Sequence, residues 1–183
     1  MCSGAQQRSL TVISSVVDHE WRIRAPEVMR EVQRHFAEIE SQSSSFHDAC
    51  KVLGLKIDFG RATYAKHGVA ERLHALSEQL LQRSVCLAEN SATKTRAFDR
   101  ILSNVPPSNK GGEVKDCAIL EDYLEICRKV RELGFEGKMI FCTSNKTDFC
   151  LGSRPHPNLA RDYANVRLTF TSNLPWAVHE LKT

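Results

Sequence analysis

The stretch from Lys115 to Phe149 constrains the fold of this chain most. It contains a helical segment and then a strand, with one aspartate at the start of the helix and another just after the strand. Asp116 opens a helical segment that should end at Gly134, and its apolar face repeats at Ile119, Tyr123, Ile126, Val130 and Leu133. Met139–Cys142 is a continuous apolar run, typical of a buried parallel strand, and Asp148 follows it. Ligands of open α/β sheets bind outside the carboxyl ends of the strands, so we expect Asp116 and Asp148 to converge there.

The other elements predicted from the sequence alternate in type, which favours an α/β fold with a mainly parallel sheet. We expect strands at 10–13, 139–142 and 168–170, and helices at 95–102, 116–133, 157–166 and 175–181. The helix that follows Ser15 should be interrupted at Ala25-Pro26, because the residue before proline avoids helical geometry.

Residues 26–88 differ from the rest, because their apolar positions are sparse and their charges many. We expect two long helices there, the first from Pro26 and the second over 62–88, inserted outside the sheet. The second should bury the face formed by Val69, Leu73, Leu76 and Leu80.

Composition and charge place weak limits on function. The chain has 183 residues and a formal net charge of +3, enough for one domain and compatible with a nucleic-acid substrate. Its seven cysteines show no zinc-type spacing, residues 1–9 are polar, and no apolar run suits a membrane helix. We therefore expect a reduced, cytoplasmic location and no membrane partner.

The acidic residues have ordinary structural interpretations as well as a catalytic one. In the ordinary interpretation, Asp116 simply caps its helix, Asp148 forms a turn, and Glu20 is one polar residue of a helix. Together they lie at or just beyond predicted strand ends. Clustered carboxylates repel one another unless a cation neutralises them, and Mg²⁺ typically takes one or two carboxylates with waters and phosphates.

Several segments resemble the PIN-like nuclease superfamily. Residues 143–149, Thr-Ser-Asn-Lys-Thr-Asp-Phe, are similar to the T-x-N/D-x-x-D-F signature after the fourth strand. Residues 106–119 resemble a Pro-Pro, glycine-rich, Lys-Asp stretch of one subfamily, and residues 16–21 resemble the helix start that supplies a second acid. The tail from His156 to Trp176 also fits.

This resemblance implies a three-layer sandwich, one PIN-like domain over 1–183, with 26–88 as a helical insertion. It implies Mg²⁺ or Mn²⁺ held by Glu20, Asp116 and Asp148, with Asn145 as an additional polar ligand, while Thr143 or Ser144 orients a carboxylate. Lys115 and Lys146, near the acidic edge, could steer a polyanion. The family's first strand ends in a ligand aspartate, and nothing before Leu10 matches it, so the resemblance implies a truncated or lost strand.

The resulting prediction is an endoribonuclease that cuts single-stranded RNA with metal-activated water. One alternative is a catalytically impaired PIN-like module that binds RNA or protein, which the missing aspartate favours. Another is an α/β interaction domain whose acidic residues are only caps. The sequence leaves open a protein partner or inhibitor, a homodimer, and the choice of metal.

Overall fold

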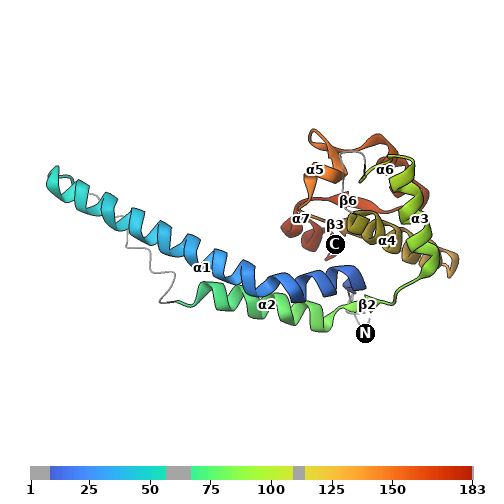
Figure 1. Cartoon of the computed structure of the whole chain (residues 1–183), viewed down its shortest axis with the longest axis horizontal. Helices are drawn as coiled ribbons and strands as arrows, with labels where there is room; N and C mark the ends of the chain where they lie inside the picture. Colours follow the sequence, from blue (N-terminus) through green and yellow to red (C-terminus); the bar gives the residue numbers. More distant parts are fainter. Residues whose placement is uncertain (1–8, 57–66, 109–113, 183) are drawn as a thin grey trace, which may run out of the picture. The chain divides into compact units, whose positions relative to one another are not determined.

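The computed structural model describes residues 9–56, 67–108 and 114–182, which form two compact units. The first unit comprises residues 1–17 and 85–183, and the second comprises residues 18–84. Figure 1 follows the elements in chain order. None of the described helices is both long and apolar enough to cross a membrane.

The first unit is a mixed α/β structure, as the sequence predicts. Its helices are α3 (Ser91–Leu102), α4 (Val114–Glu132), α5 (Lys146–Phe149), α6 (Pro157–Asn165) and α7 (Leu174–Glu180). Its strands are β1 (Val12–Ser14), β2 (Val85–Leu87), β3 (Ile140–Cys142), β4 (Cys150–Leu151), β5 (Arg154–Pro155) and β6 (Thr169–Thr171). The predicted boundaries of α4, β3 and α6 are close to those observed.

The described strands pair as three two-stranded sheets. Two pairs are parallel: β1 with β2, where Val12 lies opposite Val85, and β3 with β6, where Phe141 lies opposite Phe170. The third pair, β4 with β5, is an antiparallel hairpin that the sequence analysis did not predict. The α/β class and the parallel pairing of β3 are thus confirmed, while the larger central sheet is not among the described pairings.

The core of this unit lies between α4, α6 and the β3–β6 pair. Phe141 is its centre, because its ring contacts those of Tyr123, Phe149, Tyr163 and Phe170 at centroid distances of 5.2–6.2 Å. Leu120 and Leu159 are completely buried beside it. Gly134 adopts a φ of +85° after α4, which explains why a glycine ends this helix.

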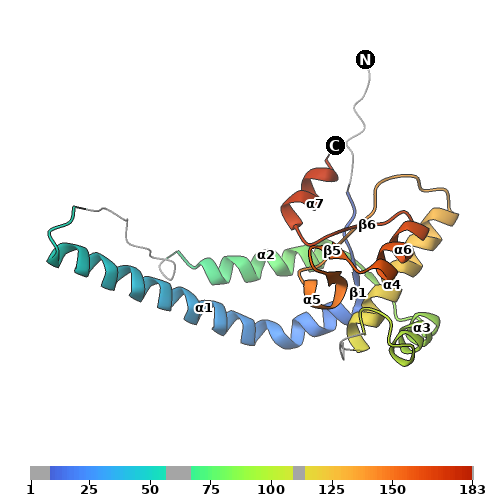
Figure 2. The same ribbon diagram turned by 90° about the horizontal axis from the view of Figure 1, so that it is seen from above.

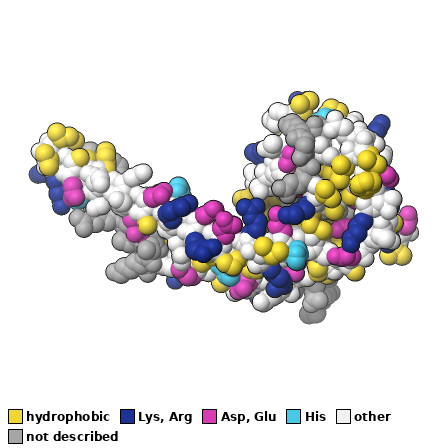
Figure 3. Space-filling view, viewed as in Figure 1, with side chains coloured by type: hydrophobic (Ala, Val, Ile, Leu, Met, Phe, Trp, Pro, Cys, Tyr) yellow, Lys and Arg dark blue, Asp and Glu magenta, His cyan; other side chains and the backbone are white. Residues whose placement is uncertain are grey.

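The second unit consists of most of α1 (Ser15–Val52) and of α2 (Val69–Arg83), which run antiparallel and side by side (Figure 2). Trp21 contacts His74 with ring centroids 5.3 Å apart, and Gln33 donates a hydrogen bond to Glu71 at 2.8 Å. As predicted, no strand occurs in 29–40 or in the described part of 66–80. At the C-terminal end of α1, Val52 and the following Leu53 are exposed, and Figure 3 shows apolar side chains there.

Three predictions for this unit are wrong. The helix α1 continues through Ala25-Pro26. A proline removes one backbone N–H and strains one turn, but the hydrogen bonds of the turns on either side still stabilise this long helix. The helix α2 ends at Arg83 and is followed by β2 rather than continuing to 88, while residues 62–66 lie outside the described part. Finally, Leu73, Leu76 and Leu80 are 48%, 60% and 49% exposed rather than buried.

Candidate functional site

The turn after β3 carries the centre of the candidate site. The strand ends at Cys142, and Asn145 then caps the short helix α5 by accepting a hydrogen bond from the backbone N–H of Asp148 at 3.3 Å. The Oγ1 of Thr143 accepts one from the backbone N–H of Asn145 at 3.2 Å. This local chain of bonds fixes the direction of the Asn145 side chain, because both ends of the turn are tied to it.

The amide of Asn145 joins the two aspartates that the sequence analysis singled out. Its Nδ2 donates to Oδ2 of Asp148 at 2.8 Å and to Oδ2 of Asp116 at 3.2 Å. Asp116 lies in the first turn of α4, so the structure brings the start of that helix to the carboxyl end of β3. The two carboxylate oxygens share one nitrogen, and they therefore lie within a few ångströms of each other.

The chemistry of this arrangement suits a cation. A neutral amide offers one N–H to each carboxylate but cannot cancel their mutual repulsion. All three residues are half-buried. Two carboxylates match the small protein ligand set that Mg²⁺ uses together with waters and phosphates, while the Asn145 amide faces them with its N–H donors. These residues therefore fit a divalent metal.

The remaining predicted site residues are less closely tied to this pair. Ser144, Lys115 and Lys146 are exposed beside it, and Thr143 acts through the backbone of Asn145. Glu20 lies in the second turn of α1, in the other compact unit, so its convergence with Asp116 and Asp148 stays a prediction. Within the described residues, no group of three or more His, Cys, Asp or Glu side chains is placed to hold a metal ion.

Sequence reasoning missed a buried charge cluster that ties α4 to its neighbours. Arg100 of α3 donates to Glu121 of α4 at 2.6 Å, to Asp162 of α6 at 2.7 Å and to the Pro106 carbonyl at 3.1 Å. The Glu121 side chain is only 4% exposed. The sequence does contain a signal for this cluster, since α3 has two arginines four residues apart and α4 has two glutamates four residues apart. Exposed helices show the same spacing, so the pattern does not by itself indicate buried ion pairs.

Comparisons with protein-family models, with curated proteins and with solved structures found no match for this chain.

Proposed function

We propose that the chain is a metal-dependent endoribonuclease of PIN-like type that acts on single-stranded RNA. The observation that carries the proposal is the shared contact of Asp116 and Asp148 with the amide of Asn145. Carboxylates converging beyond a parallel strand are what a hard divalent cation requires from a protein. The proposed fold is correspondingly a three-layer sandwich, of which the β1–β2 and β3–β6 pairs are parts.

In this proposal Asp116 and Asp148 hold Mg²⁺ or Mn²⁺, and Asn145 keeps the two carboxylates in position. The ion, when bound, supplies an activated water and charge stabilisation for phosphodiester hydrolysis. The residues of the chain bind and orient: Thr143 fixes Asn145, Asn145 fixes the carboxylates, and Lys115 and Lys146 attract the phosphate backbone of the RNA. Glu20 is proposed as a further ligand.

A second candidate is a non-catalytic module that binds RNA or a protein through the same face. The observation in its favour is that only two carboxylates meet at Asn145 in the described residues, and none of the other His, Cys, Asp or Glu residues completes a group of three. Since a misplacement of about 1 Å can cost about a hundredfold in rate, an incomplete site can bind a metal and still cut slowly. We therefore expect weak cleavage by these 183 residues.

Metal binding is tested by the melting temperature of the full chain with and without Mn²⁺. A ligand that binds only the folded state stabilises it by mass action, so Mn²⁺ should raise the melting temperature. Asp116→Asn should remove most of this increase, because it removes a charged oxygen ligand. The matched control is Asp99→Asn, the same change at an exposed position of α3, which should leave the increase intact.

A third variant separates a metal site from simple helix capping. Asn145→Asp places a third carboxylate between Asp116 and Asp148, so it should destabilise the metal-free protein and enlarge the increase caused by Mn²⁺. If the aspartates are only caps, neither Asp116→Asn nor Asn145→Asp will change the response to Mn²⁺. Cleavage of end-labelled single-stranded RNA, with and without EDTA, then distinguishes the enzyme from the binding module.

A further inference from the structure

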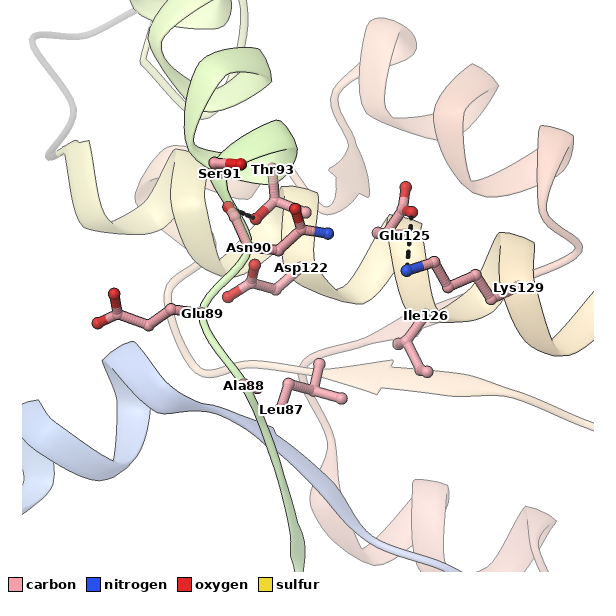
Figure 4. A pocket seen from close by; sticks show the side chains of 10 residues that line it. All are labelled: Leu87, Ala88, Glu89, Asn90, Ser91, Thr93, Asp122, Glu125, Ile126 and Lys129. Atoms are coloured by element: carbon pink, nitrogen blue, oxygen red, sulfur yellow. Dashed lines mark hydrogen bonds and ion pairs between the residues drawn. The ribbon is translucent and has the colours of Figure 1, made fainter.

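Side chains from β2, α3, α4 and the segment between β2 and α3 line a cavity of about 450 Å³ (Figure 4). Its walls come from the end of β2, the first turn of α3 and the middle of α4. Leu87 and Ile126 provide apolar surface, and Asn90, Thr93 and Asp122 provide polar groups. The volume falls within the range of about 300–1,000 Å³ that is typical of small-molecule sites.

Asp122 is the unusual residue of this cavity. It is only 8% exposed, and its Oδ2 accepts one hydrogen bond, from the Ser14 hydroxyl at 2.6 Å. Across the part of the chain that the structure describes, no lysine or arginine forms an ion pair with it, and its other oxygen accepts no hydrogen bond. The carboxylate is therefore largely buried with a single neutral donor, and a cation placed beside its second oxygen would compensate its charge.

The other two carboxylates that line the cavity are compensated by neighbouring cations. Glu125 contacts Arg96 at 2.7 Å and Lys129 at 3.3 Å, and Arg128 also pairs with it. Glu89 contacts Lys94 at 2.5 Å. The need for a positive charge in the cavity is therefore concentrated at Asp122.

We propose that this cavity binds a small organic cation, a primary ammonium group on a short aliphatic chain. The ammonium would donate to the free oxygen of Asp122, and the aliphatic chain would lie against Leu87 and Ile126. An anion is disfavoured, because three carboxylates line the cavity against one lysine, Lys129, which already pairs with Glu125 at 3.3 Å. A divalent metal is disfavoured too, because a single uncompensated carboxylate offers it too few oxygen ligands.

The inference is independent of the proposed nuclease. Asp116 and Asp122 are six positions apart on α4, which turns them to different sides of the helix. Among the described residues, Asp122 contacts Ser14, whereas Asp116 contacts Asn145.

The test uses the isotope-labelled full chain and n-pentylammonium chloride as the probe, followed by two-dimensional amide NMR. We expect saturable shift changes confined to residues 87–93 and 122–129. Pentan-1-ol has the same aliphatic chain without the charge, and ammonium chloride has the charge without the chain, so each should bind more weakly. Equal binding of either would overturn the proposal, as would shift changes scattered over the acidic surface.

Two variants and one control locate the site. Asp122→Asn keeps the size of the side chain and can still accept from Ser14, but it should weaken binding at least about tenfold because the charged acceptor is lost. Ile126→Phe keeps the charge of Asp122 and fills the cavity, so it should also weaken binding. If Asp122→Asn does not fold, Ile126→Phe alone tests whether the amine binds in this cavity. Glu136→Gln, an exposed site that is no part of the cavity lining, should stay within about twofold. Undiminished binding in the first two variants refutes the inference.

Discussion

Removing the charge of Glu121 should destabilise the first unit strongly, although the residue lies outside both proposed sites. Its carboxylate accepts from Arg96 at 2.8 Å and from Arg100 at 2.6 Å, and its side chain is 4% exposed. Arg100 is 13% exposed, and its neighbouring carboxylates raise the pKa of its guanidinium although burial opposes this. The arginine therefore stays charged, so Glu121→Gln leaves a buried cation with less compensation.

The size of the effect follows from what remains after the substitution. Breaking a buried ion pair by removing one partner costs about 3–5 kcal/mol. Arg100 keeps Asp162 at 2.7 Å, Arg96 keeps Glu125 at 2.7 Å, and the new amide can still accept a hydrogen bond. For Glu121→Gln we therefore expect a loss of about 2–3 kcal/mol in the free energy of unfolding, below the full cost of an unpaired ion.

The assay is a urea titration followed residue by residue through the amide signals of Leu120 and Leu124, which belong to the core of this unit. The matched control is Glu136→Gln, which removes an exposed ion pair with Arg167 and should shift the midpoint little. The double variant Arg100→Met with Glu121→Leu should be less destabilised than the sum of its single changes, since both charges leave together. If Glu121→Gln behaves like the surface control, the reasoning about this cluster is wrong.

Two further predictions concern Arg131 and two tyrosines of this unit. Arg131→Met should lower the unfolding free energy by about 1–2 kcal/mol in the same titration, and Arg161→Met, at an exposed position of α6, should not. The reason is that the Arg131 guanidinium donates to four carbonyl oxygens, at 2.6–3.2 Å, those of Phe135, Gly137, Val166 and Arg167. Burial also raises the pKa of Tyr123 and Tyr163 above the ordinary value of 10.0. Their contribution to stability should thus be complete below pH 10.0 and decline as the pH rises above it. In Tyr123→Phe and Tyr163→Phe this decline should be smaller, which urea titrations at several pH values measure. Constant stability through that range would contradict the assignment.

The elements that could be predicted from the sequence are those specified by local signals. The helix α4 has a long apolar period and ends at Gly134, and β3 is an apolar run bounded by polar residues. By contrast, β2 has three residues and directly follows a helix whose period leads into it, so no local signal separates the two. Likewise, Pro26 is a strong local signal, but a 38-residue helix continues through it.

The candidate site was predictable in position but not in detail. Asp116 and Asp148 could be expected to meet because the ends of the elements that carry them meet at one sheet edge. The direction of the Asn145 amide could not, because it depends on the cap of α5, a four-residue helix that has no periodicity to detect. Nor could a sequence distinguish Glu121 and Asp122, which are buried, from Glu132, which lies on the same helix and is exposed.

The helix α4 links these conclusions, because three acidic side chains on it have three different partners. Asp116 contacts an amide beyond β3, Glu121 contacts arginines of α3, and Asp122 contacts the hydroxyl of Ser14 in β1. The charge of each carboxylate is compensated in a different way. Asp116 has a neutral amide donor that a metal can supplement, Glu121 has guanidinium groups, and Asp122 has a single hydroxyl beside a cavity. A change at one position therefore removes contacts that the other two do not make. Loss of metal binding in Asp116→Asn with retained amine binding, and the reverse in Asp122→Asn, would show that one helix carries two separate sites on a common charged support.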